Sequence, residues 1–239
     1  EKLIEEAKFL AQNGVKELNL VAQETTLYGM DLCNKKLLPE LLKRLCQIDG
    51  LLWIRILYCY PEEITSELID VIKQEQKICK YLDLPIQHAS DTILQRMGRK
   101  TNRTQLTNLI HTLRQEIPDI ILRTTLITGF PGETQQDHEI LKEFIQQMQF
   151  DRLGVFPYSK EENTPAAKFP NQVLAGIKKK RQKELMSIQQ KIAFQKTKER
   201  IGKCFFVFVE GKLPEKGIYI GRTYMDAPNV DGFLFFESE

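Results

Sequence analysis

The segment from residue 120 to residue 134 constrains the fold of this chain more than any other. It begins with an apolar, partly β-branched run, typical of a strand covered on both faces: Ile120, Ile121, Leu122, Leu126 and Ile127. Gly129, Pro131 and Gly132 follow at once and let the backbone turn sharply. Thr134, with Asp137 three residues later, forms a capping-box pattern that predicts the start of a helix. A strand that passes through a glycine turn into a helix is typical of α/β folds, which place ligands at such turns.

This glycine turn admits two interpretations. Gly129 and Gly132 have no side chains, so bare backbone amides could lie against a ligand. The same spacing suits a purely structural turn between a strand and a helix. The turn alone does not decide between them.

Strands and helices alternate along the first two thirds of the chain. Apolar runs predict strands over 15–22, 52–58, 81–86, 120–127 and 152–158. Periodic apolar positions and capping residues predict helices over 3–13, 39–47, 66–77, 102–116 and 134–148. This order implies a parallel sheet with right-handed crossovers. Five units are too few for a closed eight-stranded barrel and fit a partial one.

The remainder of the chain changes character. A break rich in proline and lysine over 163–170 is followed by a long polar helix over 174–200. Three short apolar runs with glycine, proline and aspartate turns then predict strands over 204–209, 218–223 and 232–236, which suggest a small antiparallel barrel cut off before it closes. We therefore expect three parts: an α/β barrel part over 1–168, a basic linker helix over 169–200 and an incomplete β-barrel over 201–239.

Composition narrows the class of protein. The net charge of +2 at pH 7 is too small to argue for nucleic-acid binding by itself. No apolar run approaches the ~20 residues of a membrane span, so no membrane partner is expected. The five cysteines include no Cys-x-x-Cys pair, which gives no signal for a zinc site or a redox dithiol. Their odd number and wide spacing indicate reduced thiols, as in a cytoplasmic protein.

The helix expected over 174–200 is strongly basic. Between residues 178 and 200 it carries nine basic and two acidic residues. Such a run is most often the solvated face of a helix. The sharper interpretation is an electrostatic contact with RNA or with a ribosomal surface.

Polar side chains follow each expected strand. In chain order they are Gln23, Tyr60, Gln87 with His88, Glu133, and Tyr158 with Ser159. Because the carboxyl ends of parallel strands meet at one edge of a sheet, these residues should converge on one rim. That rim is the candidate active site.

Three blocks of the sequence resemble, in order and spacing, the radical S-adenosylmethionine methylthiotransferases. They are Leu-Pro-Ile-Gln-His-Ala-Ser over 84–90, Gly-Phe-Pro-Gly-Glu-Thr over 129–134, and Tyr-Ser at 158–159 with Thr-Pro-Ala at 164–166. The similarity covers essentially the whole chain. It implies a partial, TIM-like radical SAM barrel, a linker helix and a small β-barrel of TRAM type.

Within this family, three blocks favour the branch that modifies a ribosomal protein: residues 23–29, the Gln-His-Ala-Ser turn and residues 221–232. Relatives that modify transfer RNA usually carry Gln-Ser-Gly-Ser at the position of residues 87–90. The resemblance thus implies addition of a methylthio group to an aspartate β-carbon of a small-subunit ribosomal protein (protein twelve), either free or on the ribosome. An electron donor is the second implied partner.

The resemblance also implies the cofactors. A [4Fe–4S] cluster cleaves S-adenosylmethionine, and the 5′-deoxyadenosyl radical abstracts a hydrogen from an unactivated C–H bond. A second cluster supplies sulfur, and a second S-adenosylmethionine supplies the methyl group. The family holds the first cluster in a Cys-x-x-x-Cys-x-x-Cys loop, because thiolates are the usual cluster ligands.

This sequence contains no such loop. Its five cysteines match no cluster position: Cys33, Cys46, Cys59, Cys79 and Cys204. We therefore assign no metal ligand and no catalytic residue. The chain begins at Glu1, apparently within an element, and we expect it to be a fragment that binds no cluster and is inactive on its own.

The resemblance and the expected rim together suggest nine residues for cofactor binding. They are Gln23, Arg55, Gln87, Gly129, Phe130, Gly132, Glu133, Tyr158 and Ser159. Gly129, Phe130 and Gly132 would form a backbone platform against the adenosine. Tyr158 and Ser159 would flank the adenine.

The remaining assignments each keep a structural alternative. The amides of Gln23 and Gln87 can donate and accept hydrogen bonds at the amino-acid or ribose end of the cofactor, or can serve only the turn. Glu133 either contacts ligand or caps the helix. Arg55 and Arg123 could bind the cofactor carboxylate or form structural ion pairs, and only one of the two can face the rim.

The expected rim lacks the groups of ordinary acid–base catalysis. His88 has no cysteine or carboxylate cluster close to it in the sequence, and such a histidine is more often a hydrogen-bonded turn residue than a ligand or base. No lysine and no pair of carboxylates stands at the strand ends, which argues against an aldolase-type barrel.

Two other functions stay open from the sequence. One is a sister enzyme that modifies an adenosine of transfer RNA, which the basic helix and the aromatic tail would suit. The other is a non-catalytic binding module whose rim only docks a partner. Activity on the ribosomal protein or on transfer RNA separates the enzymes, and S-adenosylmethionine binding separates both from the module.

Overall fold

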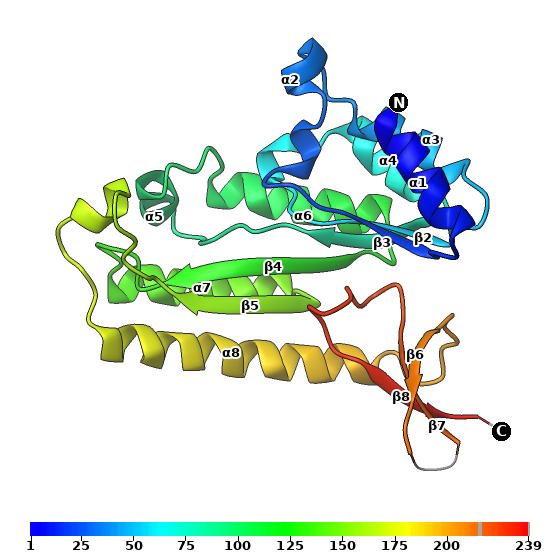
Figure 1. Cartoon of the computed structure of the whole chain (residues 1–239). Helices are drawn as coiled ribbons and strands as arrows, with labels where there is room; N and C mark the ends of the chain where they lie inside the picture. Colours follow the sequence, from blue (N-terminus) through cyan, green and yellow to red (C-terminus); the bar gives the residue numbers. More distant parts are fainter. Residues whose placement is uncertain (215–216, 239) are drawn as a thin grey trace.

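The first unit of the molecule is an open, parallel five-stranded sheet (Figure 1). The computed structural model describes residues 1–214 and 217–238. The strands lie in chain order and every neighbouring pair is parallel: β1 (Glu17–Leu20), β2 (Trp53–Ile56), β3 (Ile78–Asp83), β4 (Ile121–Thr128) and β5 (Arg152–Pro157). The predicted α/β class and parallel sheet are therefore confirmed, and the sheet is part of a TIM-like barrel.

Helices precede, connect and follow the strands. They are α1 (Lys2–Gln12), α2 (Met30–Cys33), α3 (Leu38–Cys46), α4 (Ser66–Gln74), α5 (Asp91–Arg96), α6 (Arg103–Glu116), α7 (Gln135–Met148) and α8 (Ala175–Lys198), with short 3₁₀ turns at Thr25–Leu27, Pro61–Glu63 and Pro165–Lys168. The capping box of Thr134 and Asp137 is present at the start of α7, and Asn102 caps α6 as expected. The sequence patterns missed α2 and α5, which are short.

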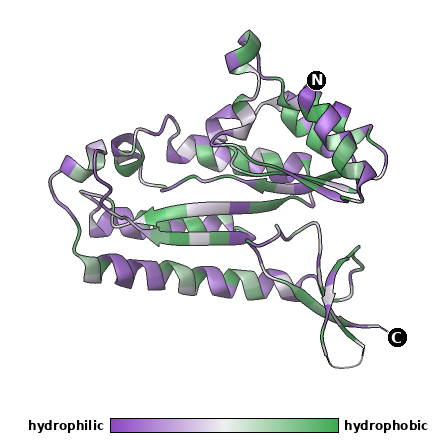
Figure 2. Cartoon of the chain, viewed as in Figure 1, coloured by the Kyte–Doolittle hydropathy of each residue, from purple (hydrophilic) through white to green (hydrophobic). Residues whose placement is uncertain are grey.

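The two faces of the sheet have different environments. Leu122 and Leu126 of β4 are fully buried in the main core, together with Phe144 of α7. Arg123 and Thr125 alternate with them along β4 and are only half-buried. In Figure 2, β4 and β5 are hydrophobic toward their carboxyl ends. The helices therefore cover one face, and the tail packs on part of the other.

Two strand boundaries differ from the prediction. β3 begins at Ile78, three residues before the predicted start, and ends at Asp83. It does not reach Pro85, because proline has no N–H to donate to a ladder. β6 begins at Phe208 and not at Cys204, since Phe205 packs against the first sheet beside Trp53.

The tail forms a second, antiparallel sheet of β6 (Phe208–Lys212), β7 (Ile218–Arg222) and β8 (Leu234–Glu237). It lies beyond the amino ends of β4 and β5 (Figure 1). Arg222 binds Glu17 at 2.6 Å, and Arg152 binds Asp226 at 2.5 Å. These ion pairs join the tail to the starts of the parallel strands, at the end of the sheet opposite the predicted rim.

The long basic helix α8 is part of the first unit. It packs against β5, β4 and α7 and runs beside β5 (Figure 1). Leu185 and Ile192 of α8 belong to the main core. The helix predicted as a linker therefore also covers the last two strands of the sheet.

Candidate functional site

Two backbone N–H groups of the turn after β4 are hydrogen-bonded to a glutamate of the same turn, Glu133. The Glu133 carboxylate accepts hydrogen bonds from the backbone N–H of Gly129 at 2.5 Å and of Phe130 at 3.2 Å. The backbone N–H of Gly132 donates to the carbonyl of Asn171. The N–H groups of Gly129, Phe130 and Gly132 are therefore occupied within the chain, and their role as a backbone platform against the adenosine stays a prediction. Glu133 caps no helix, because Thr134 and Asp137 do so.

Helix α8 holds this glutamate in place. Arg181 Nη1 lies 2.8 Å from Glu133 Oε1, and both side chains are almost completely buried. Burial raises the pKa of Glu133, while Arg181 and the turn amides oppose that shift. The turn is therefore fixed by a buried network that reaches α8.

Backbone conformation and packing explain why positions 129 and 132 of the turn are glycine. Gly129 has φ +72°, and a Cβ there would lie 2.3 Å from Cγ of Lys178. Gly132 has φ +86°, and its Cβ would lie 3.0 Å from the Arg96 guanidinium. Positive φ favours glycine at both positions, and at Gly129 the Lys178 side chain would also have to move to admit a methyl group. The structural interpretation of this turn is the one that the geometry supports.

Phe130 and Tyr158 form an aromatic wall beside the turn. Phe130 is 6% exposed, and its ring meets the Tyr158 ring edge-on with centroids 5.2 Å apart. Lys178 lies over the Tyr158 ring and donates to the Tyr158 carbonyl at 2.8 Å. The Tyr158 hydroxyl is shielded from solvent yet has no hydrogen-bond partner. It is a group that a ligand could satisfy, and Ser159 next to it is exposed.

The Gln-His-Ala-Ser turn after β3 is bound to the same network. His88 Nδ1 accepts from the Ser90 backbone N–H at 2.9 Å, and the Ser90 hydroxyl donates to Asp137 at 2.5 Å. His88 Nε2 lies 3.7 Å from Glu133 Oε2. Burial lowers the pKa of His88 to about 3, so the imidazole is neutral at pH 7. His88 is thus a buried turn residue, as the sequence suggested.

Unlike its buried neighbour His88, Gln87 has a half-buried side chain and a left-handed backbone. It has φ +68°, a left-handed backbone that is uncommon outside glycine, and Tyr58 after β2 has φ +57°. A backbone bridge ties Gln87 to Leu126 of β4. The side-chain amide of Gln87 is half-buried and makes no hydrogen bond within 1–214 and 217–238. Its donors and acceptor are available to a ligand.

Two arginines that the sequence reasoning missed stand at this rim. Arg99 donates to the Pro85 carbonyl at 2.8 Å, and its guanidinium lies 4.8 Å from the centre of the Tyr60 ring. Arg96 donates to the Pro131 carbonyl. Neither has a carboxylate partner in the described part of the chain, unlike the ion-paired Arg181. No motif marked them, and their only signal was a position shortly after the Gln-His-Ala-Ser turn.

Arg55 does not belong to the rim. It is fully buried, its Nε lies 2.9 Å from Glu17 Oε1, and Nη1 donates to the Tyr224 carbonyl of the tail. Its assignment to the cofactor is corrected to a structural ion pair. Arg123, the other strand arginine, binds Asp83 at 2.9 Å.

The turns after β1 and β2 are joined by Glu24. Its carboxylate accepts from the backbone N–H of Thr26 and of Tyr60. Gln23 beside it is exposed. These turns lie at the rim, and no hydrogen bond links Gln23 to the network around Glu133 in the part of the chain that the structure describes.

The described residues do not fit an iron–sulfur cluster. Within 1–214 and 217–238 no three histidine, cysteine or acidic side chains gather as a metal site. Burial raises the pKa of Cys46 and Cys79 to about 12, which disfavours the thiolates that a cluster needs. By contrast, Arg99 has no carboxylate partner, and the Gln87 side-chain amide and the Tyr158 hydroxyl have no hydrogen-bond partner among the described residues, so a polar organic ligand suits these groups better.

Comparison with known proteins identifies the class. The pattern of the radical SAM superfamily matches residues 1–145, and that of the TRAM domain matches residues 201–239. The chain belongs to the radical SAM superfamily. No helix among the described residues is long and apolar enough to cross a membrane.

Individual relatives give a more specific comparison than the superfamily does. The chain is 66% identical over 239 residues to "Ribosomal protein uS12 methylthiotransferase RimO" of Lachnoclostridium phytofermentans, covering 100% of this chain and 54% of the relative. It is 48% identical over 235 residues to the protein of the same name from Alkaliphilus oremlandii, covering 98% and 54%. The chain thus spans about half the length of these relatives.

Solved structures support the fold alone. Coproporphyrinogen III oxidase (HemN) from Escherichia coli, described as a radical SAM enzyme, has a TM-score of 0.56 at 18% identity, covering 82% of this chain and 44% of that one. Methylornithine synthase (PylB) has a TM-score of 0.52 at 18% identity, covering 77% and 53%.

Proposed function

We propose that this chain is part of a radical SAM methylthiotransferase that adds a methylthio group to an aspartate β-carbon of ribosomal protein uS12. The observation that carries the proposal is the 66% identity across the entire chain to a relative of that name. The division into 1–168, 169–200 and 201–239 stands as part of the proposal, although α8 packs on the first part. A ribosomal substrate, met free or on the ribosome, places the reaction in the cytoplasm.

The rim would bind S-adenosylmethionine through its unpaired groups. Arg99 would receive the carboxylate, because a guanidinium without an acidic partner matches that anion. Gln87 and the Tyr158 hydroxyl would bind the ribose or the adenine. Gly129, Phe130, Gly132 and Glu133 would act by fixing the wall that carries Tyr158. When bound, S-adenosylmethionine supplies the radical chemistry and the methyl group.

We also propose that the two [4Fe–4S] clusters of the complete enzyme are held by residues outside this chain, with electrons from a separate donor. The proposal is supported by the wide spacing of the five cysteines in the sequence and by the greater length of the relatives. Isolated, the chain would then bind S-adenosylmethionine weakly and catalyse nothing. Iron and sulfide analysis after anaerobic reconstitution tests this, and a stoichiometric cluster on the chain would refute it.

A chimaera tests the function. In the chimaera, this chain replaces the matching half of the Lachnoclostridium relative. The reconstituted enzyme is then incubated with uS12 or with transfer RNA. We expect mass spectrometry to find one methylthio group on an aspartate of uS12 and none on the RNA. Modification of transfer RNA alone would establish the sister activity, and no modification by a chimaera that holds its clusters would contradict both enzymes.

A further inference from the structure

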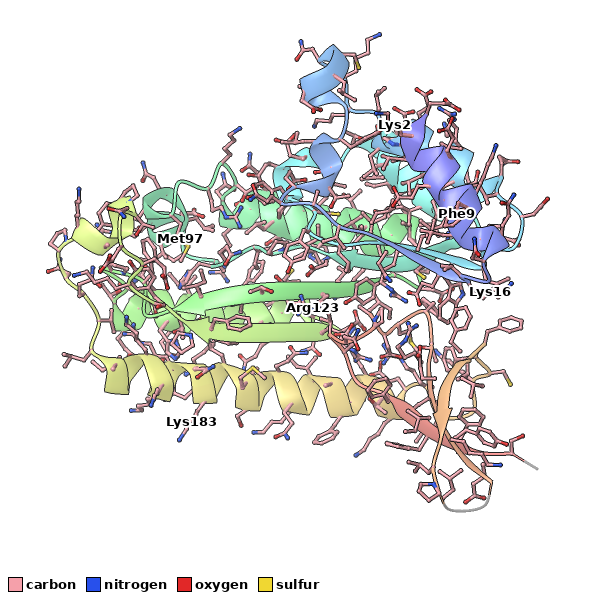
Figure 3. All side chains as sticks on the ribbon, in the orientation of Figure 1. Lys2, Phe9, Lys16, Met97, Arg123 and Lys183 are labelled. Atoms are coloured by element: carbon pink, nitrogen blue, oxygen red, sulfur yellow. The ribbon has the colours of Figure 1, made fainter. Side chains whose placement is uncertain are left out.

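The outward face of α8 carries an unpaired positive charge. Its exposed lysines, which we call the lysine face, are Lys179, Lys180, Lys183, Lys191 and Lys198. None of them forms an ion pair or a hydrogen bond within 1–214 and 217–238, whereas Lys196 binds Asp151 at 3.0 Å. Figure 3 shows Lys183 directed away from the sheet. The charge on this face is therefore open to solvent.

The acidic residues of α8 do not offset this charge. Glu184 lies to the side, where it binds His138 at 2.8 Å. Glu199, just after the helix, accepts from Gln195. The buried side of α8 is formed by Leu185, Ile192, Gln189 and Arg181, and Arg181 is bound to Glu133. The positive charge is thus confined to one side of the helix.

An aromatic ring stands among these lysines. Phe194 is 62% exposed. It follows Lys191 by three residues and precedes Lys198 by four, so the three side chains are neighbours on one helix face. Lysines that bind phosphates around an exposed ring on which a base can stack are the pattern of single-stranded nucleic-acid binding.

We propose that the lysine face and Phe194 bind a single strand of RNA. Lys183, Lys191 and Lys198 extend over about 23 Å of helix and would contact the phosphates. Phe194 would stack against one unpaired base. Lys183, Lys191 and Lys198 follow Lys178, the α8 residue that contacts Tyr158, by five residues or more, so this surface would hold an RNA-containing partner while the rim acts on its own substrate.

A membrane surface fits this helix less well. A helix that lies on a membrane needs one continuous apolar side. The exposed apolar side chains Ile177 and Met186 are nine residues apart, which places them on opposite flanks of α8 at about 100° per residue. The charged face lies between those flanks. RNA is therefore the partner that matches the arrangement.

Fluorescence anisotropy with labelled oligouridine tests the proposal on the whole chain, without cofactor. The triple variant Lys183→Glu, Lys191→Glu, Lys198→Glu should bind at least about tenfold more weakly and should lower the slope of log affinity against log salt by about 2. Its matched control reverses Lys2, Lys8 and Lys43, exposed lysines on α1 and α3, and should bind within about threefold of the parent chain. Lys2 and Lys183 lie on opposite sides of the molecule (Figure 3).

The aromatic contact has its own control. Phe194→Ala should weaken oligouridine binding by about fivefold or more without changing the salt slope. Phe9→Ala removes an equally exposed ring, 63% exposed on α1, and should have no effect. Circular dichroism verifies that each variant keeps its helix content, and Lys→Gln changes at the same three positions provide a milder second variant.

Three results would overturn the proposal. Equal loss of binding in the two triple variants would show a response to net charge alone. Unchanged binding after either the Glu or the Gln changes would remove the lysine face from the contact. Binding of α8 to phosphatidylserine vesicles but not to oligouridine would identify a membrane surface instead. None of these measurements depends on methylthiotransferase activity.

Discussion

Glu133 and Arg181 form a buried ion pair at 2.8 Å that joins the glycine turn after β4 to helix α8. The same carboxylate holds the backbone amides of Gly129 and Phe130. A single side chain thus fixes both the shape of the turn and the position of the helix. Phe130, whose ring contacts Tyr158, belongs to the same turn.

Glu133→Gln should destabilise the chain by about 3 kcal/mol, because it leaves Arg181 buried without its counter-charge. Urea unfolding followed by circular dichroism measures the change. Glu139→Gln on the exposed side of α7 removes a surface pair with Lys142 and should change stability little, because solvent screens that pair. If Glu133→Gln costs no more than this control, the pair does not hold the turn. Adding Arg181→Met to Glu133→Gln should recover part of the loss.

Local patterns predicted the fold because they act over short distances. The apolar runs of β4 and β5 and the capping residues of α6 and α7 lie within a few residues of the elements that they specify. The parallel sheet followed from the alternation of strands and helices along the chain. The boundary errors occurred where tertiary contacts decided, as at Phe205, which packs on the first sheet.

The site was harder to predict because its contacts are long-range. Glu133 meets Arg181 across 48 residues, and Arg55 meets the Tyr224 carbonyl across 169. Nothing near Arg55 in the sequence indicates that the tail will cover it. Arg99 has no motif of its own, and its importance follows only from the position of Tyr60 beneath it.

Gly129→Ala tests the packing reason for glycine. Gly98 has the same φ of +72° with nothing within 4 Å of its Cβ position. Gly98→Ala should therefore destabilise the chain by about 1 kcal/mol, which is the cost of a left-handed backbone for alanine. Gly129→Ala should cost about 3 kcal/mol, since its methyl group also displaces Lys178. Equal losses in thermal unfolding would show that the steric contact is absent, whereas adding Lys178→Ala should reduce the cost of Gly129→Ala.

His88 should make stability depend on pH. Its folded-state pKa of about 3 lies below the ordinary 6.5, so the unfolded chain binds a proton that the folded chain does not. This contribution is fully present above pH 6.5 and is lost as pH falls, by about 2 kcal/mol at pH 5. His88→Asn should flatten the dependence by that amount, and His111→Asn, at an exposed position of α6, should not. Identical profiles for the two variants would rule out the buried neutral imidazole.

Arg99 should contribute to the binding of ligands that carry a carboxylate and not to the binding of ligands that lack one. Arg99→Ala should weaken S-adenosylmethionine binding by about tenfold or more, as loss of a charged hydrogen bond does. Binding of 5′-methylthioadenosine, which has no carboxylate, should not change. Titration calorimetry measures both, with Arg103→Ala, which removes a partly exposed arginine paired with Glu143, as control. An equal loss for the two ligands would mean that Arg99 only supports Tyr60.

Asp231 should determine how firmly the tail is held. Its carboxylate accepts from the Tyr81 hydroxyl at 2.7 Å and lies 3.7 Å from Arg123 and 3.9 Å from Arg152. Burial and this carboxylate raise the pKa of Tyr81, so the hydroxyl stays protonated and donates. Asp231→Asn removes the charge that both arginines face.

The expected result of Asp231→Asn is faster amide hydrogen exchange in β6, β7 and β8, with β3 and β4 unchanged in their central residues. A weakening of about 1–3 kcal/mol corresponds to the loss of one charged, buried hydrogen-bond network. Glu237→Gln, at the exposed end of β8, leaves these contacts in place and should exchange like the parent chain. If exchange rises equally across both sheets, Asp231 stabilises the whole molecule. In that case it does not specifically bind the tail to the starts of the parallel strands.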